Sequence, residues 1–154
     1  GNSPFEYMNP KLKEKKIAFT TTNGTQAIEK SSAAQEVIIG SFLNLSSVAR
    51  QLLFGKNNIL IVCAGWKGKV NLEDTLFAGA LVEKLKGSIE PDCDAPIAAQ
   101  RLYNLAKDDM VKFLSTSSHV KRLAKLNIYK DIEFCLTPDQ YQVVPVLKDG
   151  MLKA

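Results

Sequence analysis

A loop of hydroxyl side chains around one glycine is the first stretch of this sequence that could do chemistry. Residues 19–25 read FTTTNGT and follow a short apolar run. Asn23-Gly24 permits a tight turn, and a helix starting there would direct backbone N–H groups and the hydroxyls of Thr21, Thr22 and Thr25 toward an anion. This pattern indicates a phosphate or sulfonate site, with Gly24 at a positive φ. A purely structural strand-to-helix turn is an equal alternative, because threonine favours strands and Asn-Gly favours turns.

A second loop, CAGWKGKVNLED at residues 63–74, combines two glycines, the only tryptophan and two lysines with two acids. Lys67 and Lys69 could bind an anion. Glu73 and Asp74 would lie in the first turn of the following helix, where carboxylates could hold a Mg²⁺ ion that bridges to a substrate phosphate. The alternative is structural, since acids at a helix N-terminus are favoured by the dipole and Asn71 with Asp74 resembles a capping pair.

The only histidine, His119, lies in the stretch STSSHVKRL. Arg122 is three residues later, so on a helix the two side chains would share a face and could meet an anion together. The alternative is that a histidine beside serines only begins a helix. A serine hydrolase is excluded because the chain has no G-x-S-x-G motif. Cys63 lacks the C-x5-R spacing of a cysteine phosphatase, because position 69 is a lysine, and we expect a small buried residue there.

The composition limits the class of ligand and the compartment. The net charge of +4 is spread along the chain without a basic block, which favours a small anionic substrate and argues against nucleic acid. The three cysteines are far apart and form no C-x-x-C pair, so we expect three reduced thiols and a cytoplasmic protein. No apolar run approaches the roughly 18–20 residues of a membrane span, and we expect no membrane partner.

The pattern of apolar residues predicts a single α/β domain over residues 1–154, with three layers and a mostly parallel or mixed sheet flanked by helices. Short β-rich runs predict strands at 16–22, 36–42 and 58–64, followed late in the chain by strands at 131–137 and 142–150. Helical spacing predicts helices at 44–53, 71–87 and 94–114, with a short helix from Ser117. Ligands of such sheets bind at the carboxyl ends of the strands, so we expect the two loops to face one another.

Several motifs together resemble one known family, the 2-phosphosulfolactate phosphatase (ComB) family. They are GNSP at 1–4, TTTNGT at 20–25, GSFLN at 40–44, CAGWKGKVNLEDTLFAGALV at 63–82, SSHVKRL at 117–123 and DIEFC at 131–135. The resemblance implies a Mg²⁺-dependent phosphatase that converts 2-phosphosulfolactate to sulfolactate and phosphate in coenzyme M biosynthesis. It implies Glu73 or Asp74 as metal ligand or general base. Substrate binding would fall to the residues of both loops and the third motif: Thr22, Asn23, Gly24, Thr25, Lys67, Lys69, His119 and Arg122.

Members of that family normally carry a substantial segment before the GNSP motif. We therefore expect the chain to be the C-terminal portion of a ComB-like phosphatase, and a portion that lacks strands to associate into a homo-oligomer through its open edge. Two other functions stay open on the sequence. The chain could be a non-catalytic domain that binds or senses a small anion, or a structural part that needs the N-terminal segment to complete its sheet.

Overall fold

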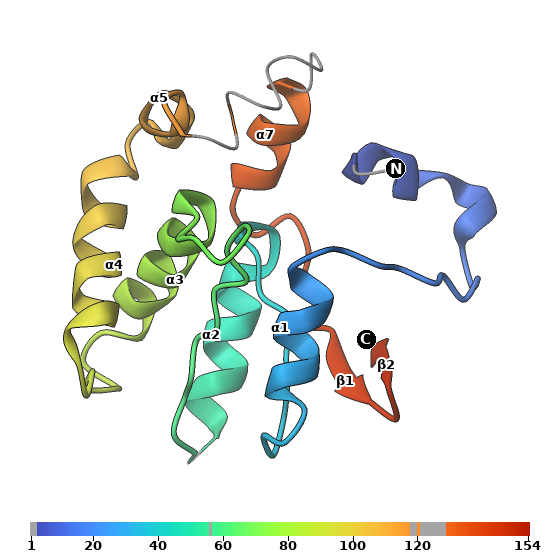
Figure 1. Ribbon diagram of the computed structural model, residues 1–154, viewed down its shortest axis with the longest axis horizontal. Helices are drawn as coiled ribbons and strands as arrows, with labels where there is room; N and C mark the ends of the chain where they lie inside the picture. Colours follow the sequence, from blue (N-terminus) through green and yellow to red (C-terminus); the bar gives the residue numbers. More distant parts are fainter. Residues whose placement is uncertain (1–2, 56, 118–119, 121–128) are drawn as a thin grey trace.

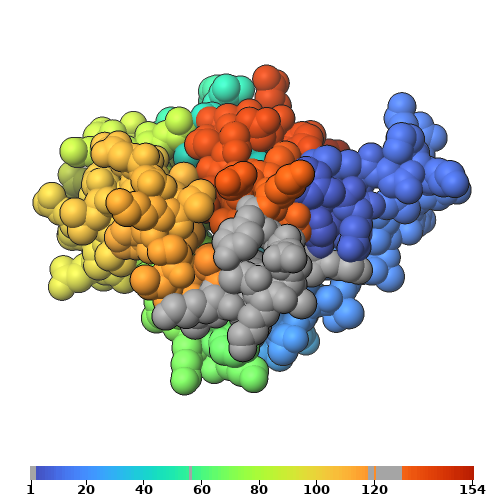
Figure 2. Space-filling view, turned by 90° about the horizontal axis from the view of Figure 1, so that it is seen from above, coloured from blue at the N-terminus to red at the C-terminus, as the bar shows by residue number. Residues whose placement is uncertain are grey.

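The computed structural model describes residues 3–55, 57–117, 120 and 129–154. It shows a chain of helices with one small two-stranded sheet near the C-terminus (Figure 1). Three short 3₁₀ helices are η1 (Pro4–Met8), η2 (Pro10–Leu12) and η3 (Phe42–Asn44). The α-helices are α1 (Gly24–Ser31), α2 (Leu45–Phe54), α3 (Leu72–Leu85), α4 (Asp94–Ala106), α5 (Met110–Leu114) and α7 (Tyr129–Leu136). The strands are β1 (Val146–Lys148) and β2 (Met151–Lys153). Figure 2 shows that the N-terminal residues and α4 lie at opposite ends of the molecule.

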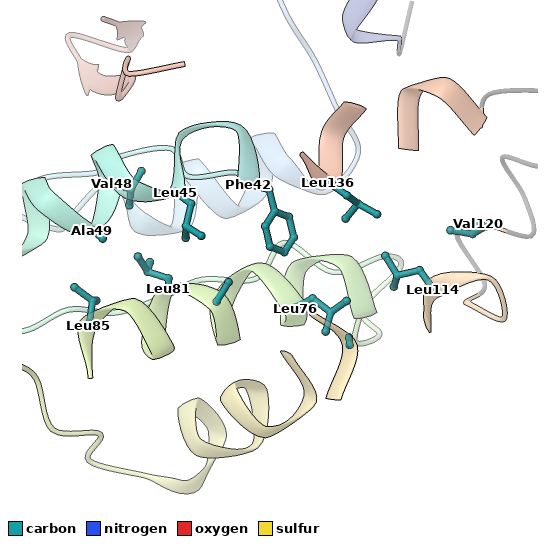
Figure 3. Close-up of a cluster of buried hydrophobic side chains, with 12 residues drawn as sticks. Phe42, Leu45, Val48, Ala49, Leu76, Leu81, Leu85, Leu114, Val120 and Leu136 are labelled. Atoms are coloured by element: carbon teal, nitrogen blue, oxygen red, sulfur yellow. The ribbon is translucent and has the colours of Figure 1, made fainter. Parts of the chain in front are cut away.

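The hydrophobic core lies mainly between α2 and α3. Leu45, Val48 and Ala49 project from α2 toward Leu81 and Leu85 of α3 (Figure 3). Their spacing on each helix follows the helical repeat, which places one apolar face of α2 against one face of α3. The predicted helices at 44–53 and 71–87 are therefore confirmed.

Helix α3 also packs closely on α4. A Cβ atom added to Gly79 would lie 2.0 Å from the carbonyl oxygen of Ala99, so only glycine permits this approach. Next to this contact, the Glu83 carboxylate accepts hydrogen bonds from the amides of Gln100 and Asn104 at 2.7 and 2.9 Å. Helices α3 and α4 are therefore closely packed, and the loop that precedes α3 is joined to this pair.

The single helix predicted at 94–114 is wrong in one respect, because it is broken at residues 107–109. Asp109 caps a new helix there, and its Oδ1 accepts a hydrogen bond from the backbone N–H of Lys112 at 2.9 Å. The strand predicted at 131–137 is also wrong, because these residues lie mostly in α7. Ile132 and Leu136, four residues apart, pack on the core from that helix.

The predicted parallel sheet is not present among the described residues, where the only sheet pairs β1 with β2 in antiparallel fashion. Residues 37–39 lie beside β1, with Ile39 N–H donating to Pro145 O and Leu147 N–H donating to Val37 O, both at 2.9 Å. No strand forms at 16–22 or 58–64. The chain is thus a protein of mixed helices and strands.

Candidate functional site

The first loop ends where α1 begins, at Gly24. The hydroxyl oxygen of Thr21 accepts a hydrogen bond from the backbone N–H of Thr25 at 3.1 Å, and the Thr25 hydroxyl donates to the Thr21 carbonyl. Thr21 therefore caps the helix, and one amide of the predicted anion cradle is already occupied. The N–H groups of Gly24 and Gln26 have no hydrogen-bond partner in the described part of the chain. They are the amides that remain to bind an anion.

The prediction of a positive φ at Gly24 is wrong. Positive φ angles among the described glycines occur at residues 65, 68, 87 and 150. A Cβ atom at position 24 would lie 2.8 Å from the Thr21 hydroxyl oxygen, so any other residue there would force one of the two side chains to shift. A larger residue would displace the side chain that caps α1.

The second loop is a tight hairpin. Trp66 and Lys69 exchange two backbone hydrogen bonds of 3.0 Å, and the central residues Lys67 and Gly68 have φ angles of 52° and 71°. Positive φ at both central positions defines a type I′ turn. Gly65, just before it, has a φ of 65°, and a Cβ atom there would lie 2.6 Å from the Lys69 carbonyl oxygen. The glycines of this loop thus set its shape.

A hydrogen bond joins the two loops. The side-chain Oδ1 of Asn23 accepts from the backbone N–H of Lys67 at 3.3 Å. The Asn23 side chain thus bonds to the second loop, and it makes no capping bond to its own helix α1. The start of α1 and the tip of the hairpin are therefore neighbours, although they lie far apart in the sequence.

The lysines of the hairpin are exposed and positioned near this junction. Lys67 Nζ lies 4.7 Å from the centre of the Trp66 ring, which is a cation–π contact. Lys69 and Thr22 are also exposed, and Thr25 is half-buried in the first turn of α1. The loops therefore offer two mobile ammonium groups and the free amides of α1 to an anion in solvent.

The two acids of α3 hold different parts of the site. Asp74 Oδ2 accepts a hydrogen bond from Gly65 N–H at 2.7 Å and so anchors the hairpin. Glu73 Oε1 accepts from the hydroxyl of Ser117 at 2.9 Å. Consecutive residues on a helix point in different directions, which explains the division. The capping bond of α3 comes from Asn71, whose Oδ1 accepts from Glu73 N–H at 3.2 Å, and not from a pair with Asp74.

The third sequence motif reaches the site at Ser117. Its hydroxyl donates to Glu73 and also accepts from the backbone N–H of Val120 at 3.1 Å. The predicted anion-binding residues His119 and Arg122 lie outside the described residues. The Thr21 hydroxyl, which was expected to face an anion, caps α1 instead. Ser117 was not among the predicted site residues, and its signal was a hydroxyl beside a predicted helix start, which is a common capping pattern.

Cys63 is exposed, so the prediction of a buried cysteine is wrong. Neighbouring protein atoms nevertheless desolvate its thiol, and this desolvation, together with the negative charge of Asp74, raises the pKa of Cys63 above its ordinary value. A raised pKa keeps a thiol protonated and makes it a poor nucleophile. All three cysteines are unpaired, as predicted.

The loops open into one large cavity of about 1030 Å³. Gly24, Glu73 and Asp74 line the part next to the two loops, which we call its polar end. Glu36 and Asn58 also line the cavity, but most of its wall is apolar. The described residues contain no group of three or more histidines, cysteines and acids that could hold a metal ion. Mg²⁺ needs only one or two carboxylates beside water and phosphate oxygens, and Asp74 Oδ1 has no hydrogen-bond partner in the described part. The donors present therefore fit Mg²⁺.

Within the part of the chain that the structure describes, no helix has both the length and the apolar character to cross a membrane.

Comparison with known proteins gives one consistent family. The model of the 2-phosphosulpholactate phosphatase family matches residues 1–150. A probable 2-phosphosulfolactate phosphatase of Caldanaerobacter subterraneus subsp. tengcongensis is 44% identical over 154 residues, which are 99% of this chain and 64% of the relative. Proteins of the same description from Thermotoga maritima and Thermotoga petrophila are 46% and 45% identical over 98% of this chain and 65% of their own length. The chain thus spans slightly less than two thirds of these relatives.

Proposed function

The chain belongs to the 2-phosphosulpholactate phosphatase family, and we propose that it contributes the phosphate site of a Mg²⁺-dependent phosphatase acting on 2-phosphosulfolactate. Sulfolactate and inorganic phosphate are the products, and we place the reaction in coenzyme M biosynthesis in the cytoplasm. The observation that carries the proposal is the hydrogen bond from Lys67 N–H to Asn23, which joins the loop with free helix amides to the loop with lysines and acids.

The reaction is a hydrolysis. A water oxygen forms a bond to phosphorus, the ester P–O bond breaks, and the departing oxygen of sulfolactate takes up a proton as its hydroxyl group is restored. The transferred phosphoryl group carries most of the charge that develops, so positioning and charge neutralisation provide most of the catalysis. The substrate also carries a sulfonate and a carboxylate, which require further cationic groups.

The anion-binding groups are the N-terminus of α1 and the hairpin lysines. The N–H groups of Gly24 and Gln26 point from a helix start, where the dipole favours negative charge. Lys67 can leave the face of Trp66 for the substrate at small cost, since an exposed cation–π contact is worth about 0.5–1 kcal/mol. We assign the remaining charged groups to Lys69, His119 and Arg122, the last two because they follow Ser117 closely in the sequence.

The carboxylates have separate roles in this proposal. Glu73 binds Ser117 through Oε1 and its Oε2 is buried, so we assign it to positioning the segment after Ser117. Asp74 keeps Oδ1 available at the polar end of the cavity and would hold Mg²⁺ or accept a proton from the attacking water. A bound Mg²⁺ ion would neutralise phosphate charge and polarise the phosphoryl group.

Phosphate release from 2-phosphosulfolactate tests the function directly. We expect release with Mg²⁺ that stops with EDTA and falls at least about 100-fold in Asp74→Asn, the scale of a lost catalytic electrostatic contact. Asp92→Asn, an exposed acid distant in sequence from the site, is the matched control and should behave as the parent. Binding of phosphate without any turnover would instead support a non-catalytic anion-binding domain.

A further inference from the structure

The cavity is much larger than its polar end requires. Its volume of about 1030 Å³ lies at the top of the roughly 300–1,000 Å³ that hold drug-sized ligands, whereas the proposed substrate has a three-carbon skeleton. The remainder is lined mainly by apolar side chains from α1, from residues 37–42, from residues 59–62 and from α3; they include Ile28, Ile38, Ile59, Ile61, Phe77 and Leu81. A small acid does not account for this apolar volume.

One segment that lines the cavity has no backbone hydrogen-bond partner among the described residues. Residues 58–64 read NILIVCA, typical of a buried strand, yet they make no backbone hydrogen bond with any described residue. Ile59 and Ile61 are half-buried toward the cavity, while Leu60 is 86% exposed. Backbone N–H and C=O groups beside apolar side chains are costly when unpaired. This segment therefore offers a strand edge.

Residues 37–39, which also line the cavity, offer a second edge. The backbone C=O of Val37 and the N–H of Ile39 point toward β1, where they hydrogen-bond to Leu147 and Pro145. Ile38 thereby forms an isolated β-bridge with Val146. Because backbone groups alternate sides along a strand, the N–H and C=O of Ile38 point the other way, where the described residues supply no partner. Two segments that line the cavity therefore carry backbone groups with no partner among the described residues.

Helix α1 flanks the same space without being packed. None of its residues is buried, although Ala27 and Ile28 line the cavity. An amphipathic helix of this kind normally covers a sheet. A strand in the cavity would give α1 a surface to pack on and would place α1 and α3 on the two faces of one sheet.

We propose that the apolar cavity accepts a β-strand from the region of the family's polypeptide that lies outside the match to this chain. Slightly more than a third of each relative's length lies in that region, which is ample for a strand of about 5–6 residues. Buried on both faces, the strand should be apolar throughout and free of proline.

The test mixes this chain with a polypeptide that comprises the residues of the Caldanaerobacter relative outside the aligned region. We expect an equimolar complex by native mass spectrometry, and at least tenfold slower amide exchange at residues 58–64 by hydrogen–deuterium exchange, since ladder bonds protect amides. Absence of a complex, or a complex without protection there, would overturn the proposal. A dimer of the chain alone with those amides protected would assign the groove to a second copy and would also overturn it.

Two sets of variants locate the contact. Ile61→Lys places a charge in the groove and should weaken the complex at least tenfold, whereas Leu105→Lys, on the exposed face of α4, should not. If Ile61→Lys alters the circular dichroism of the free chain, Leu60→Pro and Ile61→Pro are tested for complex formation in its place. These residues direct their N–H groups to opposite sides, so one of the two prolines must weaken binding. None of these readouts depends on phosphatase activity.

Discussion

Asn23 and Lys67 are linked by a hydrogen bond of 3.3 Å between the Asn23 side-chain oxygen and the Lys67 backbone N–H. The bond places the tip of the hairpin at the N-terminus of α1. Asp74 fixes the base of the same hairpin through Gly65, so the loop is held at both ends. The free amides of α1, the lysines and the acid are thereby kept in one small region.

Asn23→Ala should weaken substrate binding while leaving the fold intact. Loss of one hydrogen bond of about 1 kcal/mol corresponds to about a fivefold rise in KM for 2-phosphosulfolactate. Asn9→Ala is the control, because Asn9 also accepts a backbone hydrogen bond, from Lys11, at a distant exposed turn. Equal kinetics in both variants would show that the junction does not position substrate.

Asp74→Asn should make Cys63 more reactive. Desolvation of the thiol and the Asp74 charge both raise the pKa of Cys63, and the amide removes only the second cause. The pKa should fall, so iodoacetamide should modify Cys63 faster at mildly alkaline pH, as followed by peptide mass spectrometry. Asp92→Asn serves as control, and an unchanged rate in Asp74→Asn would place the carboxylate away from the thiol.

Asp139→Asn should reduce stability at neutral pH by about 1 kcal/mol, the typical value of a helix cap. The Asp139 carboxylate accepts hydrogen bonds from the N–H and hydroxyl of Ser46 in the first turn of α2. Desolvation raises the pKa of Asp139, but these bonds together with the positive charges of Lys84 and Arg50 outweigh it, and the net pKa is lowered. The stabilisation is therefore present above the unfolded-state pKa and lost as pH falls through the folded-state pKa.

Urea unfolding of the parent and of Asp139→Asn across this range measures the effect. The difference between them should close in acid. A difference that stays constant with pH would show that the charge of Asp139 does not contribute.

Gly79→Ala should destabilise the protein by about 1–3 kcal/mol or more, because the new methyl group would overlap the Ala99 carbonyl oxygen. Gly55→Ala is the matched control, since Gly55 has a φ of −76° and a Cβ atom there would be no closer than 3.4 Å to its neighbours. Thermal unfolding should separate the two variants by several degrees. Similar melting temperatures would mean that α3 and α4 do not pack as closely as described.

Features that depend on neighbouring residues in the chain could be predicted from the sequence. The apolar stripe of α2 and the Asn71 cap of α3 both follow from short-range patterns. The break after α4 also had a local signal, Asp109 as a cap, which a continuous helical repeat concealed. Residues 131–137 were predicted as a strand because a short apolar run is compatible with both the helical and the strand periodicity. The packing of Ile132 and Leu136 on the core distinguishes the helix from the strand.

Sheet formation could not be predicted from the sequence in the same way, because a strand needs a partner as well as a suitable composition. Residues 58–64 have the composition, yet no described segment lies beside them to form a ladder. The different partners of Glu73 and Asp74 could not be predicted either. Ser117, which binds Glu73, lies after α3 in the sequence, whereas Gly65, which binds Asp74, lies before it. The close approach of the Thr21 hydroxyl to Gly24 is a structural detail of the same kind.

Calorimetric titration of inorganic phosphate, with and without saturating Mg²⁺, tests most directly whether anion and metal share one site. We predict that Mg²⁺ raises phosphate affinity at least about fivefold and that phosphate raises Mg²⁺ affinity by the same factor, because coupling is reciprocal. Asp74→Asn should abolish this coupling, while Asp92→Asn should preserve it. Equal phosphate affinity with and without Mg²⁺, or undiminished coupling in Asp74→Asn, would contradict the account and leave Asp74 only as the anchor of the hairpin.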